Sequence, residues 1–167
     1  MKKYKNADSF VQRKAEKELF KQFVTNKKEK YNYNDNDIEQ NKRIWLNDDD
    51  DDDNYIEPDI YSKKYGIVGE IHTHLGALKS AQAHKVAADI LKMLVVEKFY
   101  GKELTKYIVV CSEEEKKQLT ESKSYLAFTI KYYGIKVEYY PLSAELQQEL
   151  EETVKKQDLY GKEAIDA

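Results

Sequence analysis

Carboxylate and imidazole side chains occur close together in the middle of this sequence. Asp59 follows a proline, and ten residues separate it from Glu70, which is followed by Ile71 and His72. Carboxylate oxygens are ligands that Mg²⁺ prefers, and such an ion can activate water and offset the charge that develops on phosphorus. Histidine titrates near neutral pH, so His72 could orient or deprotonate the attacking water. The stretch is therefore a candidate for a hydrolytic metal site.

Two adjacent strands would position these residues. Alternation of apolar and polar side chains predicts strands over residues 55–62 and 65–74, joined by a turn of two lysines. The same alternation puts Asp59 and Glu70 on the polar faces of the two strands, and His72 on the face of Glu70. If the strands pair as a hairpin, we expect the two carboxylates to approach closely enough to share one divalent cation.

A helix over residues 80–100 follows the two strands. Its polar stripe, with Gln82, Lys85 and Asp89 at helical spacing, should lie opposite a broad apolar face. That apolar face consists of Ala83, Val86, Ala87, Ile90, Leu91, Leu94 and Val95. The first turn of the helix would meet the site, and its free N–H groups and positive dipole end suit phosphate. We therefore expect Lys79 and Gln82 to contact substrate and Lys85 to supply positive charge.

The remaining elements complete an α/β pattern. Hydrophobic periodicity predicts further helices and strands, the helices over residues 8–30, 113–119, 124–133 and 143–156, and the strands over residues 42–46, 107–111 and 135–141. The order α-β-β-β-α-β-α-β-α indicates a mixed β-sheet flanked by helices, in a single domain spanning residues 1–167. Residues 47–54 include six consecutive aspartates, which repel one another and predict a solvated, flexible loop.

Composition narrows the class of protein. The chain has 167 residues, of which 35% are charged, and no apolar run approaches the roughly 20 residues that a membrane span needs. Residues 1–30 lack the apolar stretch of a signal peptide, and they hold ten Lys or Arg against four Asp or Glu. Such a basic helix could meet phosphate. Cys111 is the single cysteine, which excludes a disulfide framework and a multi-cysteine zinc site and favours a cytoplasmic location.

With these elements in place, the sequence resembles the PD-(D/E)XK nuclease superfamily, whose fold is called restriction-endonuclease-like. The Pro-Asp pair that ends at Asp59, the ten-residue gap and the Glu-Ile-His triplet that starts at Glu70 are similar to the motif of that superfamily. The α-β-β-β-α-β order of elements matches its core. Residues 67–93 also resemble a set of small uncharacterised bacterial proteins of this type, and the whole resemblance covers roughly residues 8–142.

The resemblance implies a metal-dependent nuclease that hydrolyses the phosphodiester bonds of nucleic acid, with DNA the expected partner. It implies Mg²⁺ or Mn²⁺ bound by Asp59 and Glu70, with the carbonyl of Ile71 as a further ligand. An acidic residue of the first helix, Glu18 or Glu16, would complete the site. Because cutting both strands of a duplex commonly takes two sites, the resemblance also suggests a homodimer.

One position departs from the pattern of the superfamily, because His72 stands where the motif has lysine. Either His72 does the work of that lysine, or Lys85 or Lys79 supplies the charge from the helix. The third alternative is a degenerate nuclease fold that binds nucleic acid or a partner protein without cutting.

A different class of hydrolase is a further hypothesis. The pair His72 and His74, with a nearby carboxylate, resembles the His-x-His pair of zinc hydrolases of the JAB/MPN type, and two histidines plus a carboxylate are a plausible zinc set. That family also needs an acidic residue three positions after a serine. Here Ser80 is followed three residues later by Ala83, so the acidic ligand is missing.

Overall fold

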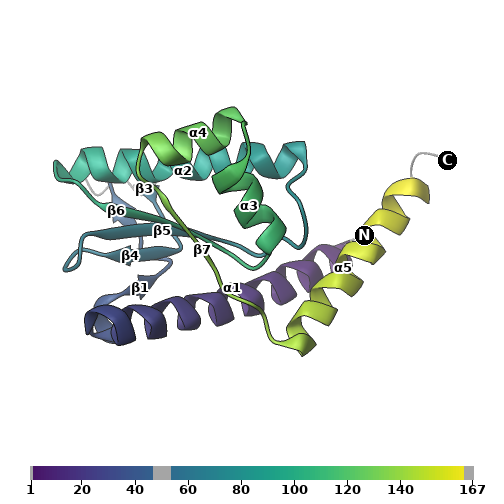
Figure 1. The fold of residues 1–167 in the computed structure, drawn as a ribbon. Helices are drawn as coiled ribbons and strands as arrows, with labels where there is room; N and C mark the ends of the chain where they lie inside the picture. Colours follow the sequence, from purple (N-terminus) through teal and green to yellow (C-terminus); the bar gives the residue numbers. More distant parts are fainter. Residues whose placement is uncertain (1, 47–53, 164–167) are drawn as a thin grey trace.

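The computed structural model describes residues 2–46 and 54–163, and it describes side chains for residues 10–46 and 54–155. Its centre is a five-stranded sheet in the order β1-β4-β5-β6-β7 (Figure 1). The strands of this sheet are β1 (Glu39–Gln40), β4 (Ile60–Ser62), β5 (Ile67–His72), β6 (Thr105–Val110) and β7 (Lys136–Tyr139). β4 runs antiparallel to both neighbours, whereas β5, β6 and β7 are parallel. The expected α/β fold, a mixed sheet flanked by helices, is confirmed.

Helices pack on both faces of this sheet (Figure 1). Apolar side chains of two helices cover one face and those of three helices cover the other. The first face carries α1 (Lys2–Tyr31) and α5 (Ala144–Glu163), and the second carries α2 (Ser80–Tyr100), α3 (Glu113–Glu121) and α4 (Tyr125–Tyr132). The chain crosses from β5 to β6 through α2, and from β6 to β7 through α3 and α4, because parallel strands need such crossovers. Among the described helices, none combines the length and apolar character that crossing a bilayer requires.

β5 is the most interior strand of the sheet, and all six of its residues are buried. Its odd-numbered residues Ile67 and Ile71 pack toward α1, and Val68 packs toward α2. Gly69 lies against β6, where an added Cβ would be 2.9 Å from the carbonyl oxygen of Tyr107. The alternation along the strand therefore directs Glu70 and His72 toward α2.

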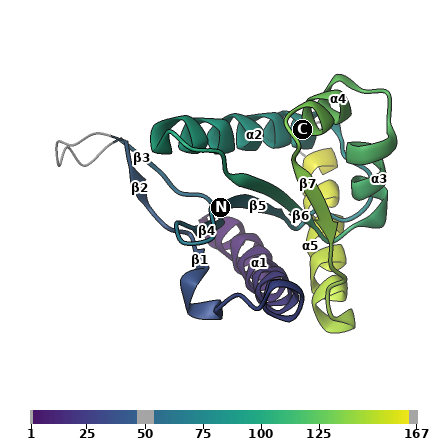
Figure 2. The same ribbon diagram turned by 60° about the vertical axis from the view of Figure 1, so that its left-hand side comes forward.

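The strand expected over residues 55–62 is two separate strands. β3 (Tyr55–Ile56) pairs with β2 (Ile44–Trp45) in a two-stranded ribbon beside the main sheet, and only β4 joins that sheet (Figure 2). The break falls at Pro58, which has no N–H to donate to a ladder. The first strand of the main sheet is β1, in a stretch for which the sequence predicts neither a helix nor a strand. The aspartate run lies outside the described residues, so the loop expected over residues 47–54 is described only at Asn54.

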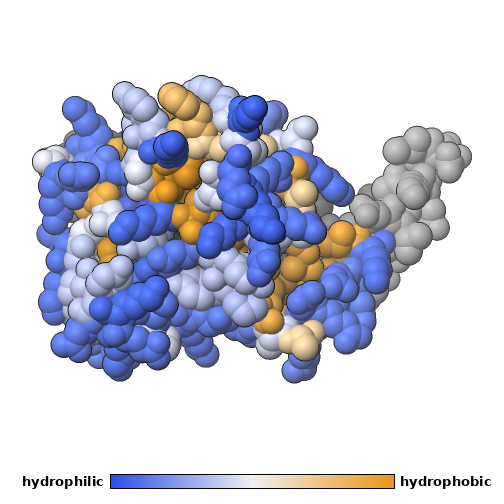
Figure 3. Space-filling model, viewed as in Figure 1, coloured by the Kyte–Doolittle hydropathy of each residue, from blue (hydrophilic) through white to orange (hydrophobic). Residues whose placement is uncertain are grey.

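Helix α2 has the bounds expected from the sequence but buries a different face. Leu91 and Val95, expected in the core, are 63% and 37% exposed, while Asp89 is only 6% exposed. The reason lies in the sheet beneath the helix, where β5 presents Glu70 and His72. A helix rotated so that polar side chains meet these two groups leaves part of its apolar stripe at the surface. Figure 3 shows apolar side chains at the surface over α2 and α4. Phe128 of α4 is an exposed apolar residue.

Candidate functional site

Asp59 and Glu70 lie opposite each other on neighbouring strands. The antiparallel register of β4 and β5 pairs Ile60 with Gly69, so the next positions outward are Asp59 and Glu70. Glu70 belongs to the face of the sheet that α2 covers, because its strand neighbour Val68 packs there, whereas Asp59 immediately precedes β4 and borders a hollow together with residues of α1. The expectation that the hairpin juxtaposes these two carboxyl groups agrees with this register.

Asp59 also reaches the backbone of β5. Its Oδ2 accepts a hydrogen bond of 2.8 Å from the N–H of Ile71, beyond the last paired residues of β4. In an extended strand, the N–H and C=O of one residue point to the same side. The carbonyl of Ile71 therefore points toward the side of β5 on which Asp59 lies, which is the direction required of an additional oxygen ligand.

Glu70 is a buried carboxyl group with an incomplete set of partners. It is 2% exposed, and its Oε2 lies 2.8 Å from Nζ of Lys92. Its Oε1 is buried and has no hydrogen-bond partner among the described residues. Burial and then the nearby charge of Asp59 raise the pKa of Glu70 to about 8, although Lys92 opposes the shift. A further cation beside the group would favour its ionised form.

A third carboxyl group comes from helix α1. Burial raises the pKa of Glu16, and the charge of Asp59 raises it further, against the opposing charges of Lys85 and Arg13. Glu16 also lines the same surface hollow as Asp59. Of the two acidic residues considered for the first helix, Glu16 is therefore the one that lies beside Asp59.

Glu18 does not lie in this group. Its Oε1 accepts a hydrogen bond of 2.6 Å from the N–H of Ser143, and its Oε2 accepts one of 3.0 Å from the Ser143 hydroxyl. The expected metal ligand Glu18 is therefore corrected to a link between α1 and the start of α5. The physical reason is the helical repeat, since two residues along a helix turn the side chain by about 200°.

His72 is held by two buried carboxylates. Its Nε2 lies 3.0 Å from Oδ2 of Asp89, and its Nδ1 lies 3.0 Å from Oε1 of Glu115. Burial alone would lower the pKa of His72, but the hydrogen bonds to Asp89 and Glu115 outweigh it and raise the pKa to about 9. The imidazolium thus joins β5 to α2 and α3, with both nitrogens engaged. This geometry does not favour the expected role of His72 as the group that deprotonates water.

Lys92 is the residue that sequence reasoning missed. Its Nζ lies 2.8 Å from Glu70 and 3.5 Å from Asp89, so it supplies the positive charge that we had assigned to Lys85 or Lys79. Burial would lower its pKa, but the two carboxylates and Asp59 raise it. The signal was present in the spacing, because Lys92 is three residues after Asp89 and seven after Lys85 on the same helical stripe.

The other expected contacts of α2 have mixed outcomes. The backbone N–H of Lys79 donates to Oε1 of Gln82 at 2.6 Å, and Nε2 of Gln82 lies 3.0 Å from Nδ1 of His74. These bonds begin the helix and fix the loop before it. Lys85 is exposed and lines a cavity together with Gln82. Of the expected substrate contacts, Gln82 therefore faces a cavity, while nothing places the Lys79 side chain there.

That cavity lies at the carboxyl end of β5. It has a volume of about 210 Å³ and is bounded by the loop after β5 and by α1, α2, α3 and α5. Glu16 lines both this cavity and the hollow of about 440 Å³ beside Asp59. Of the acidic cluster of Glu16, Asp59 and Glu70, Glu16 therefore borders both spaces, whereas Asp59 borders only the hollow.

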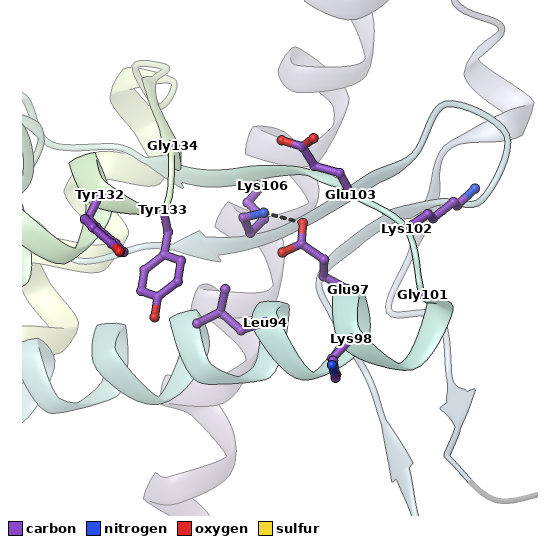
Figure 4. Close-up of a pocket in the computed structure, with 10 residues that line it drawn as sticks. All are labelled: Leu94, Glu97, Lys98, Gly101, Lys102, Glu103, Lys106, Tyr132, Tyr133 and Gly134. Carbon is purple, nitrogen blue, oxygen red and sulfur yellow. Dashed lines mark hydrogen bonds and ion pairs between the residues drawn. The ribbon is translucent and has the colours of Figure 1, made fainter.

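A wider hollow of about 760 Å³ lies away from the acidic cluster, between α2, α4 and the start of β6 (Figure 4). Its central polar contact is the ion pair between Glu97 and Lys106, and Glu97 also accepts a hydrogen bond from the N–H of Leu104. Lys106 also donates to the Leu104 carbonyl. These contacts fasten the end of α2 to β6, and none of the residues expected to act in catalysis lines this hollow.

The geometry of possible metal ligands and the comparisons with known proteins complete the description of the site. Within the described ranges, no group of three or more His, Cys, Asp or Glu side chains is arranged so that it could hold a metal ion. Compared with family models, curated proteins and solved structures, the chain gives no match.

Proposed function

We propose that the protein is a metal-dependent phosphodiesterase that cuts nucleic acid at the acidic cluster. The observation that carries the proposal is the pairing of Asp59 with Glu70, whose buried Oε1 has no partner within the described part of the chain. A buried carboxylate oxygen without a partner is costly and calls for a positive charge or a donor. The order α1, β1, β4, β5, α2, β6 supports the resemblance to nucleases of the PD-(D/E)XK type.

The donor set of the cluster fits Mg²⁺ or Mn²⁺. Both are bound by hard oxygen ligands, commonly one or two carboxylates together with water and substrate phosphate. Asp59, Glu70 and the carbonyl of Ile71 would hold the ion, and Glu16 would add a fourth oxygen or bind through water. Such a site would leave coordination positions for water and substrate phosphate. The bound ion would activate water and polarise the phosphodiester.

Residues of this chain prepare the rest of the site. Lys92 contacts Glu70 and takes the part that the nuclease motif gives to its lysine, which is to supply positive charge beside the carboxylate pair. Lys85 and Arg13 carry positive charge near Glu16, where a phosphate would approach. His72 holds β5 in place against α2 and α3.

The other readings make different use of these residues. A zinc site on His72 and His74 is disfavoured, because both ring nitrogens of His72 bind carboxylates and His74 bonds to the Ala77 carbonyl and to Gln82. A fold that binds nucleic acid without cutting would use Lys85 and Arg13 to contact phosphate, and any metal at the acidic cluster would serve binding alone.

Mn²⁺ binding and cleavage together test the proposal. The Mn²⁺ affinity is measured by electron paramagnetic resonance, and cleavage is assayed on single-stranded and duplex DNA and on RNA. We expect Asp59→Asn to weaken Mn²⁺ binding at least tenfold and to abolish metal-dependent cutting. The matched control is Asp35→Asn, whose carboxylate is exposed and pairs with Lys28.

The results of these assays distinguish the cutting from the non-cutting hypothesis. Cutting that requires the metal and survives Asp59→Asn would refute the site. Mn²⁺ binding at this cluster without cutting of any substrate would support the non-cutting alternative instead. The accompanying proposal of a homodimer is tested by sedimentation equilibrium with and without duplex DNA.

A further inference from the structure

We propose that the cavity at the carboxyl end of β5 binds one nucleobase that carries an exocyclic amino group, such as cytosine or adenine. This inference rests on the proposed function, because it assigns a base-binding subsite to the same nuclease. Three features support it: the buried acceptor at the cavity wall, the apolar sides of the cavity and its position next to the acidic cluster.

The acceptor is Glu115, which lines the cavity and has no exposed surface. Its Oε1 is bonded to His72, while its Oε2 is buried and has no hydrogen-bond partner among the side chains and backbone that the structure describes. A buried carboxylate oxygen is an acceptor only, and leaving it unpaired is costly. The chemistry that satisfies it is an N–H donor, and carboxylates recognise the amino group of cytosine in this way.

The sides of the cavity suit a planar ring. Leu75 and Leu78 from the loop after β5 face the space together with Leu150 and Val154 of α5. Its volume of about 210 Å³ is far above the roughly 15 Å³ that admits a single water. Apolar walls combined with a few converging polar groups are typical of small-ligand sites.

The position of the cavity connects it to the proposed chemistry. Glu16 borders both the cavity and the hollow at Asp59. Lys85 lines the cavity, and its positive charge is close enough to Glu16 to lower the pKa of that carboxyl group. A nucleotide whose phosphate lies at the acidic cluster could therefore place its base in this cavity, with Lys85 near the phosphate. Uracil and thymine present a carbonyl oxygen where cytosine has its amino group, and that oxygen would face a carboxylate.

The test compares two ligands that differ at this one group. Binding of cytidine 5′-monophosphate and of uridine 5′-monophosphate is measured by titration calorimetry, with a chelator present so that no metal contributes. We expect cytidine monophosphate to bind at least tenfold more tightly. Equal affinities for the two nucleotides, or a preference for uridine monophosphate, would overturn the proposal.

Two variants locate the binding site. Val154→Trp, a change at the cavity rim, should fill the space and abolish nucleotide binding, whereas Val95→Trp on the outer surface of α2 is the matched control. Glu115→Gln adds an N–H₂ group and should reduce the preference for cytidine monophosphate at least tenfold, with Glu114→Gln as its control. If Glu115→Gln fails to fold, Val154→Trp still decides, because undiminished binding in that variant would refute the site.

Failure of this inference can be told from failure of the proposed function. Mn²⁺ binding that is lost in Asp59→Asn but unchanged in Val154→Trp, together with equal affinities for the two nucleotides, would remove the base subsite and keep the nuclease site. A clear preference for cytidine monophosphate in a protein that binds no Mn²⁺ would support the base subsite and refute the metal-dependent reaction.

Discussion

The two oxygens of Glu70 have different surroundings, since one contacts the ammonium group of Lys92 and the other is buried without a partner. A lysine beside such a carboxylate does two things. It lowers the cost of the buried charge, and it supplies a positive charge close to where a phosphate would be attacked. Lys92 is therefore the residue whose replacement should slow the proposed reaction most clearly.

The substitution Lys92→Met tests this expectation. We expect cleavage to fall on the order of a hundredfold or more, because a charge that acts on the transition state is lost. Mn²⁺ binding should persist or tighten, since the ammonium group no longer competes for Glu70. Cleavage rates and Mn²⁺ titrations are measured side by side, with the exposed Lys98→Met as the control. A Lys92→Met protein that cuts at the original rate would show that this lysine serves stability alone.

His72 is expected to serve stability rather than the proton transfer that its residue type first suggested. Replacing it by Gln removes the cation from between Asp89 and Glu115, which are both buried. Breaking a buried ion pair from one side costs on the order of 3–5 kcal/mol, and we expect His72→Gln to lower the free energy of unfolding by about that amount. Urea denaturation measures the loss. A variant that keeps its stability and loses only cleavage would return His72 to the catalytic role.

Residue chemistry could be predicted only in part. Alternation and a ten-residue gap are local properties, so the sequence was enough to predict that Asp59 and Glu70 face each other. The partners of His72 come from α2 and α3, and Glu115 lies 43 residues away in the sequence. No local pattern indicates such a contact. Lys92 lies further along α2 than Lys79 and Lys85, the two lysines for which the sequence analysis predicts this role.

At the scale of elements, the close packing of β5 against β6 at Gly69 fixes the position of Glu70. Gly69 sits where a Cβ would be 2.9 Å from the carbonyl oxygen of Tyr107 and 3.1 Å from its Cβ. We expect Gly69→Ala to lower the free energy of unfolding by about 1–3 kcal/mol, because overpacking forces the two strands apart. Thermal unfolding gives the change in stability.

The same substitution has a functional readout. Since Gly69 precedes Glu70, displacement of β5 should also weaken Mn²⁺ binding, whereas Gly101→Ala, at a helix end with open space around it, should destabilise without affecting the metal. Equal effects of the two substitutions on Mn²⁺ affinity would contradict this account.

Elements were predicted well where the sequence pattern is long and strongly periodic. Helix α2 has its expected bounds, because a 21-residue amphipathic segment ends at Gly101 in the left-handed conformation. Pro58 limited the accuracy nearby, since it splits one alternating stretch between two sheets. The two-residue strand β1 carries no periodic signal at all. Which face α2 buries depends on the polar groups of β5 below it, and only the tertiary structure reveals them.

For the whole molecule, two buried groups make stability depend on pH. The folded protein raises the pKa of Glu70 from 4.5 to about 8 and that of His72 from 6.5 to about 9, so the folded state binds these protons more tightly than the unfolded chain. The contribution of Glu70 is complete below pH 4.5 and is lost as the pH rises through about 8. The contribution of His72 is complete below pH 6.5 and is lost as the pH rises through about 9.

We therefore expect the metal-free protein to lose stability as the pH rises from about 5 to about 9, by on the order of 3 kcal/mol or more. Urea denaturation in a chelating buffer at a series of pH values measures the slope. Glu70→Gln should flatten the curve below about pH 8. A stability that increases with pH over this range would contradict the assigned surroundings of both groups.

The pairing of β5 with β6 also determines when the acidic cluster can assemble during synthesis of the chain. Every carboxylate of the acidic cluster has been synthesised once the chain reaches Glu70, yet the strand that flanks β5 on its other side spans Thr105–Val110. Glu115, which anchors β5 through His72, comes later still. A nascent chain ending at Tyr100 would thus contain all three carboxylates of the cluster but lack β6 and α3, the elements that hold β5 in place. Assembly of the acidic cluster would therefore wait until Glu115 has been synthesised, well after the last of its own carboxylates.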